Sequence, residues 1–111
     1  MNGATTRALV PPWIAVSFEN SWANYGGGYQ EAAYYRGQDM VVHLRGVINS
    51  GTTGATAFTL PAGYRPPASC IFAVASNGAF GVVDITAAGA VSMTSVNNTY
   101  VSLDSISFRT V

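Results

Sequence analysis

Aromatic and amide side chains recur in the turn-rich segments of this sequence. An aromatic ring can stack on the C–H face of a pyranose sugar, and short amide groups can hydrogen-bond to the hydroxyls of that sugar. This combination of residue types indicates a saccharide-binding surface. The residues that offer it in an early loop are Trp22, Asn24, Tyr25 and Tyr29, and those at later turns are Asn77, Asn97, Asn98 and Tyr100. Trp22 has a second interpretation as a core residue of the fold, whereas Tyr25 and Tyr29 are expected to be exposed.

The carboxylates do not predict an enzyme. A glycosidase needs two carboxylates that face each other at about 5–10 Å. Glu19 and Glu31 flank the same loop, so the sequence does not exclude that they form such a pair. Asp39 and Asp104, in contrast, are typical of turn or bulge residues. The five carboxylates are Glu19, Glu31, Asp39, Asp84 and Asp104. We therefore expect no catalytic activity and no cofactor.

His43 and Cys70 are single representatives of their residue types. One histidine does not form a zinc site in a monomer. On a three-fold axis, three copies of His43 could hold a metal or an anion; the alternative is a polar residue on an outer or inter-subunit strand face. Cys70 lies in an apolar run and is expected to be a buried small hydrophobe. A metal site in one chain is not predicted.

The composition bounds the class of protein. The chain has 111 residues, of which 49 % are apolar and 9 % charged, against an ordinary charged fraction of about 25 %. It contains no lysine and has no net charge, which argues against nucleic acid as a partner. No apolar run approaches the ~20 residues of a membrane span. Because a neutral, apolar monomer would be poorly soluble, we expect other subunits to cover part of the surface.

Short alternating runs separated by turn residues predict an all-β fold. Residues 40–48 form the clearest strand, with Val42, Leu44, Gly46 and Ile48 on the core face. Asn77-Gly78 predicts a hairpin between residues 70–76 and the run that follows. In the last segment the apolar set changes face near Asp104, which indicates a bulge or a strand that crosses between sheets. About eight strands are expected, in an antiparallel β-sandwich of jelly-roll type, with residues 1–12 as a linker and residues 13–111 as the domain.

Residues 58–69 hold three prolines, a glycine and a tyrosine between two predicted strands. Pro61 and Gly63 suit a β-turn, and Pro66 and Pro67 fix extended backbone that lacks two donors. This segment is expected to be a stiff corner that carries the chain from one sheet to the other, with the ring of Tyr64 against the sandwich. A ligand-binding loop is the alternative.

The central third of the chain resembles a known family. The match depends on the spacing of turn-forming and core residues, and it extends more weakly to residues 83–91 and 103–108. Its positions are Tyr34, Arg36, Val42, Leu44, Gly46, Ile48, Gly51, Gly54, Phe58, Leu60, Pro61, Gly63, Tyr64, Arg65 and Pro66. In this pattern the chain resembles the distal head domains of bacteriophage tail fibres and receptor-binding proteins.

The resemblance implies a homotrimeric β-sandwich at the tip of a virion tail fibre, assembled in the host cytoplasm, with the rest of the fibre N-terminal to it. Such a head attaches to a saccharide on the host cell surface. The lack of lysine argues against a strongly anionic receptor. The alternatives are a structural module that trimerises or caps a fibre, and a bacterial lectin-like domain.

Overall fold

The computed structural model describes residues 12–111, and this part of the chain contains strands but no helix. The predicted linker, residues 1–12, lies outside the described residues except for Pro12. Within residues 12–111, no helix is long and apolar enough to cross a membrane. The strands are β1 (Ile14–Ala15), β2 (Ala23–Asn24), β3 (Ala33–Arg36), β4 (Val41–Arg45), β5 (Val47–Asn49), β6 (Thr56–Thr59), β7 (Cys70–Ser76), β8 (Ala79–Ile85), β9 (Ala90–Ser95), β10 (Val101–Ser102) and β11 (Ser107–Arg109).

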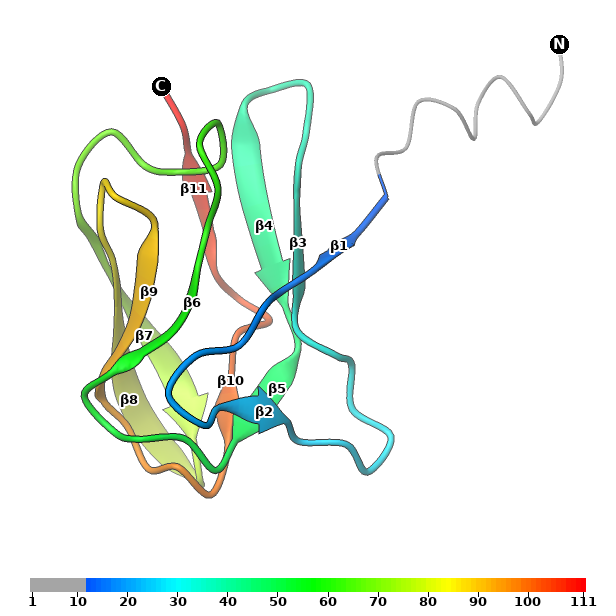
Figure 1. The fold of residues 1–111 in the computed structure, drawn as a ribbon, viewed down its shortest axis with the longest axis vertical. Coiled ribbons are helices and arrows are strands. Elements are labelled where there is room, and N and C mark those ends of the chain that lie inside the picture. Colours follow the sequence, from blue (N-terminus) through cyan, green and yellow to red (C-terminus); the bar gives the residue numbers. More distant parts are fainter. Residues whose placement is uncertain (1–11) are drawn as a thin grey trace, which may run out of the picture.

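These strands form two antiparallel sheets, which confirms the all-β prediction. The smaller sheet has the order β1-β3-β4-β11, and the larger has the order β2-β5-β10-β7-β8-β9-β6. In Figure 1 the sheets face each other, with β3 and β4 on one side and β6 to β9 on the other. Their facing side chains build one shared core. Val42 and Leu44 contribute from the smaller sheet, and Phe58, Ile85 and Met93 from the larger.

The chain changes sheet at Gly46. The sequence predicted one strand over residues 40–48, but the structure divides it into β4 in the smaller sheet and β5 in the larger. The predicted inward face is confirmed, because Val42, Leu44, Gly46 and Ile48 are all buried. The buried set therefore continues through the crossing although the hydrogen-bonded partners change, and Val47 between Gly46 and Ile48 is buried as well.

A second segment crosses between the sheets beside Gly46. The chain leaves the larger sheet after β10 and enters the smaller one at β11, as the change of face near Asp104 predicted. Gly46 N donates to a carboxylate oxygen of Asp104 at 2.7 Å, and Leu103 N donates to Gly46 O at 2.8 Å. Leu44 N also donates to Ile106 O at 3.0 Å. The two crossings are therefore hydrogen-bonded to each other.

The proline-rich segment, residues 58–69, does not join the two sheets, so that prediction is wrong. It leads from β6 to β7, which both belong to the larger sheet, and it passes the ends of β8 and β9, which lie between them (Figure 1). The meander β7-β8-β9 with β6 returned beside β9 is a Greek key. The misjudgement arose because a stiff turn in sequence does not reveal which strands lie between its two ends.

The local features of this segment agree with the prediction. Tyr64 N donates to Pro61 O at 3.1 Å, and Gly63 has φ +91°, so residues 61–64 form a β-turn with glycine at the position that requires positive φ. The ring of Tyr64 packs edge-on against Tyr34 of the smaller sheet, with centroids 5.3 Å apart. Arg36 adds a hydrogen bond of 2.7 Å to Gly63 O. The segment thus contacts both sheets although it connects strands of one.

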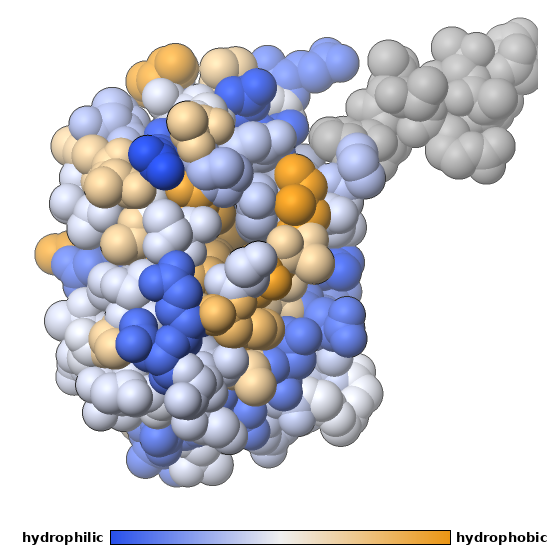
Figure 2. Space-filling model, viewed as in Figure 1, coloured by the Kyte–Doolittle hydropathy of each residue, from blue (hydrophilic) through white to orange (hydrophobic). Residues whose placement is uncertain are grey.

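The chain after β1 closes the gap between the sheets. Val16 N donates to Ala32 O at 3.4 Å, and Glu19 N donates to Ala57 O at 2.8 Å, so this segment links β6 to the region before β3. Val16 and Phe18 are partly buried against the core. Figure 2, which has the same view as Figure 1, shows hydrophobic side chains near the middle of the visible face of the molecule, with more hydrophilic ones around them.

The hairpin predicted at Asn77-Gly78 is confirmed. Both residues have positive φ, 49° and 80°, as a two-residue turn of type I′ requires. β7 and β8 pair along their whole lengths from Cys70↔Ile85 to Ser76↔Ala79. Cys70 is only half-buried and not fully buried as expected.

Replacing Gly46 by alanine should destabilise the fold severely. Gly46 has φ +109°, and an added Cβ would lie 2.6 Å from the backbone N and Cα of Ala32. Left-handed strain and overlap with backbone should together lower the free energy of unfolding by at least about 3 kcal/mol, measured by urea denaturation. Gly54→Ala is the matched control, because Gly54 has φ +83° with open space around it, so it should lose only about 1–2 kcal/mol. Equal losses for the two variants would contradict the steric explanation.

The free energy of unfolding should fall in alkaline solution because Tyr34 ionises. Burial raises the pKa of the Tyr34 hydroxyl above 10.0, and the neighbouring Tyr64 adds to this shift. Because the unfolded chain ionises this tyrosine at a lower pH than the folded chain does, its contribution is complete below about pH 10 and is lost as pH rises through the folded pKa. Urea titrations from pH 8 to 11 should therefore show a shallower decline for Tyr34→Phe than for the wild type. Parallel declines would show that Tyr34 is not responsible.

Candidate functional site

The three tyrosines that were predicted to bind a sugar line one pocket. This tyrosine pocket has a volume of about 230 Å³. The rings of Tyr25 and Tyr29 lie 5.5 Å apart, and those of Tyr25 and Tyr100 lie 5.8 Å apart. Tyr29 is 59 % exposed and Tyr25 is 38 % exposed, as expected. The pocket is lined by Tyr25, Tyr29, Val47, Tyr100, Ser102 and Asp104.

The loop that carries Tyr25 and Tyr29 is shaped by its own backbone. The three glycines between them, residues 26–28, have φ of 79°, 64° and 88°, a conformation that other residues rarely adopt. Tyr25 N donates to Val47 O at 2.8 Å, and Tyr29 N donates to Gly26 O at 3.1 Å. At the base of the loop, the side-chain oxygen of Asn24 accepts a hydrogen bond from Ala32 N at 2.8 Å. Asn24 therefore closes the loop.

Tyr100 reaches the pocket from the opposite side. Its hydroxyl accepts a hydrogen bond of 2.9 Å from Gly78 N in the β7–β8 turn. This bond ties the pocket to the hairpin and brings the turn at Asn77 close to it. Ser102 and Asp104 then supply a hydroxyl and a carboxylate at the floor. The pocket thus combines aromatic faces with small polar groups.

Trp22 does not belong to this surface, and its interpretation as a sugar-stacking residue is wrong. It is 3 % exposed and lies in the core, as its second interpretation proposed. Its indole N–H donates to Thr52 O at 3.2 Å. Gly51 lies directly against the ring, where an added Cβ would be 2.1 Å from the indole carbons. Trp22 is therefore a core residue that holds the segment around Gly51 and Thr52 against the core.

Asn97 and Asn98 organise the turn before β10. The side-chain oxygen of Asn97 accepts from Thr99 N at 2.9 Å, and the side-chain amide of Asn98 donates to Gly51 O at 2.8 Å. Asn97 N also donates to the hydroxyl of Ser76 at 2.8 Å. Both residues are exposed at the surface, and one polar atom of each side chain is already hydrogen-bonded to the backbone.

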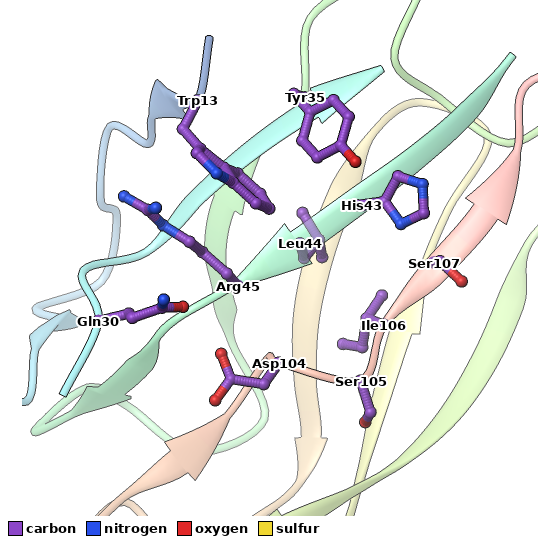
Figure 3. Close-up of a pocket in the computed structure, with 10 residues that line it drawn as sticks. All are labelled: Trp13, Gln30, Tyr35, His43, Leu44, Arg45, Asp104, Ser105, Ile106 and Ser107. Carbon is purple, nitrogen blue, oxygen red and sulfur yellow. The ribbon is translucent and has the colours of Figure 1, made fainter. Parts of the chain in front are cut away.

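A larger pocket that the sequence did not predict lies on the outer face of the smaller sheet. This sheet pocket has a volume of about 360 Å³ and is drawn in Figure 3. Tyr35 of β3 pairs with His43 of β4, which pairs with Ser107 of β11, so their side chains form one row across the strands. The pocket is lined by Trp13, Gln30, Tyr35, His43, Leu44, Arg45, Asp104, Ser105, Ile106 and Ser107.

The aromatic groups of the sheet pocket contact one another. Trp13 meets Tyr35 edge to face, with centroids 4.6 Å apart, and Tyr35 stacks on His43 at 5.0 Å. The guanidinium of Arg45 lies 4.6 Å from the centre of the Trp13 ring, and Arg45 Nε donates to Glu31 O at 3.3 Å. Arg45 is thereby held in one orientation above the sheet.

The described residues place few carboxylates and potential metal ligands at the two pockets. Asp104 is the one carboxylate that lines either of the two pockets, whereas glycoside hydrolysis by two carboxylates needs a facing pair. Within residues 12–111, no group of three or more His, Cys, Asp or Glu side chains could hold a metal ion. His43 lies half-buried on the outer strand face, in agreement with its interpretation as a surface-facing residue.

Comparison of the chain with models of known protein families gives no match, and searches of curated proteins and solved structures find no significant similarity. The resemblance to tail-fibre head domains therefore depends on the sequence motif alone.

Proposed function

We propose that this chain is the receptor-binding head of a bacteriophage tail fibre and that it attaches to a saccharide on the host cell surface. The observation that carries the proposal is the tyrosine pocket. It is a concave site in which the ring centroids of Tyr29 and Tyr100 both lie within 6 Å of the ring centroid of Tyr25, and a hydroxyl and a carboxylate also line it. The motif that resembles tail-fibre heads supports the same conclusion through the fold, and apart from Val47 the residues that line the pocket lie before and after this motif in the sequence.

The chemistry of this pocket matches a neutral or weakly charged sugar. Ring faces of Tyr25 and Tyr29 present polarisable surface to the C–H groups of a pyranose. Phenol hydroxyls, the Ser102 hydroxyl and the Asp104 carboxylate offer hydrogen bonds to sugar hydroxyls. Within residues 12–111, no cationic side chain lines the tyrosine pocket, which favours a ligand without strong negative charge.

The outer face of β7 and β8 supports association with further copies of the chain, and we propose a homotrimer. Ile71 is 73 % exposed and Phe80 is 77 % exposed, and alternation places both on this face with Ala73, Ala75 and Val82. Such a patch marks an interaction site.

A second copy of the chain is the partner that fits this face best. The face carries one carboxylate, Asp84, whose oxygen already accepts a hydrogen bond of 2.7 Å from Thr94. Two or three such faces could therefore meet without strong repulsion between like charges. A structural module that trimerises or caps a fibre, without a receptor site of its own, is the second candidate, and the same exposed face favours it.

Loss of the two exposed tyrosines should weaken attachment. The double variant Tyr25→Ala with Tyr29→Ala removes two stacking surfaces, so binding to host cells or wall polysaccharide should weaken about tenfold or more, equivalent to about 1.4 kcal/mol. The binding is measured by cell pull-down and by biolayer interferometry. The matched control, Tyr25→Phe with Tyr29→Phe, keeps both rings and should retain most of the binding. If the alanine variant binds host material as the wild type does, the tyrosine pocket is not the receptor site.

Polar substitutions on the outer face of β7 and β8 should dissociate the assembly. Ile71→Ser with Phe80→Ser removes the largest exposed apolar groups of this face, and analytical ultracentrifugation should show a shift from trimer to monomer mass. Both side chains are mostly exposed, so the melting temperature of the monomer should not collapse. Val111→Ser is the matched control, because Val111 is 66 % exposed and lies outside this hairpin. This control variant should remain trimeric. A wild type that sediments as a monomer at micromolar concentration would contradict the trimer directly.

A further inference from the structure

The tyrosine pocket and the sheet pocket adjoin each other. Asp104 lines both of them. On one chain segment, Arg45 lines the sheet pocket and Val47 lines the tyrosine pocket, with only Gly46 between them. On the other, Ser105 lines the sheet pocket and Ser102 lines the tyrosine pocket. The two pockets are therefore lined by neighbouring residues of the same two crossing segments. These segments are hydrogen-bonded to each other, from Gly46 N to the carboxylate of Asp104 at 2.7 Å.

We propose that the two pockets form one continuous site for an oligosaccharide, with Asp104 at its centre. This inference rests on the proposed function, and it assigns the sheet pocket, which that function does not use, as a second sugar subsite. The receptor is then recognised as a chain of several sugar units and not as a single terminal residue.

Asp104 is suited to the central position. One oxygen of its carboxylate is occupied by Gly46 N, which fixes the side chain. The residue is exposed, and the second oxygen has no donor among the hydrogen bonds of the described residues. A carboxylate oxygen has two lone pairs, so this oxygen can accept hydroxyls of sugar units that lie on either side of it.

The sheet pocket has the parts of a sugar subsite. Trp13, 40 % exposed, and Tyr35 supply aromatic surface. Arg45 is fixed by the Trp13 ring and by Glu31 O, which leaves the two amino groups of its guanidinium for a ligand. A planar guanidinium presents parallel donors in a fixed geometry. Figure 3 shows the side chains of Trp13, Arg45, Gln30 and Asp104 arranged around the same opening.

The charge of the sheet pocket favours a neutral polyhydroxyl chain over an anion. Among the described residues, its lining holds one guanidinium and one carboxylate, whose charges offset each other. A nucleotide or a strongly anionic polymer would require an excess of cations. An apolar ligand would leave the carboxylate, the guanidinium and the hydroxyls of Ser105 and Ser107 without partners.

The test uses an array of bacterial surface glycans in which each structure is present as mono-, di-, tri- and tetrasaccharide. The full chain is measured as wild type, Trp13→Ala, Trp13→Phe, Asp104→Asn and the double variant of Tyr25 and Tyr29 to alanine. For a glycan that binds, wild-type affinity should rise about tenfold or more from disaccharide to tetrasaccharide. Trp13→Ala should abolish this rise, whereas Trp13→Phe should retain most of it. Asp104→Asn keeps an oxygen for Gly46 but loses the second acceptor, so it should also reduce the rise.

The outcomes separate this inference from the proposed function. If the tyrosine variant loses binding and Trp13→Ala keeps the full dependence on chain length, the tyrosine pocket binds the receptor alone and the continuous site is wrong. If Trp13→Ala loses all binding while the tyrosine variant loses none, the sheet pocket acts alone, which also overturns the inference. If the wild type binds no glycan of any length, the continuous site is overturned and the proposed function loses its support with it. Equal thermal melting of Trp13→Ala and Trp13→Phe shows that both are folded.

Discussion

The whole molecule depends on the place where two chain segments pass together from one sheet to the other. Gly46 takes a backbone conformation with φ +109°, against the backbone of Ala32 and with no space for a side chain. Asp104 fixes the second segment to it through the Gly46 N–H. This hydrogen-bonded crossing joins the two sheets that enclose the core. It also determines which side chains of the outer surface become neighbours, so the fold and the candidate site have the same origin.

Sequence reasoning identified the faces of the strands better than their partners. The alternation in residues 40–48 correctly marked the buried set, but it continues unbroken through Gly46 and so could not reveal that the chain changes sheet there. The same alternation places Val47 on the face opposite to this buried set, yet Val47 is only 6 % exposed and lines the tyrosine pocket. In the last segment, the apolar set does change face at Asp104, and the crossing there was predicted. Alternation reports which side is buried, whereas sheet membership is decided by contacts between residues far apart in sequence.

The candidate site was predicted in part for a similar reason. Tyr25 and Tyr29 could be found because they flank three glycines that force a loop into solvent. The sheet pocket could not be found in this way, since Tyr35, His43 and Ser107 become a row only when the register of β3, β4 and β11 is known. Trp22 was ambiguous because an indole serves equally well in a core and in a sugar site, and only the close approach of Gly51 decides between them.

The proline-rich span between β6 and β7 has a consequence for the order of folding. β7, β8 and β9 are joined by short turns and can pair locally, whereas β6 must wait for β9 before it has a partner. A late step of this kind ordinarily loses chain entropy, and contacts distant in sequence slow the search for the native state. Prolines at 61, 66 and 67 restrict the span before any contact forms, which lessens the freedom that closure removes. The terminal strand β6 can therefore dock on the meander with a smaller loss of chain entropy, and it then covers the edge of β9, which would otherwise be open to pairing with other chains.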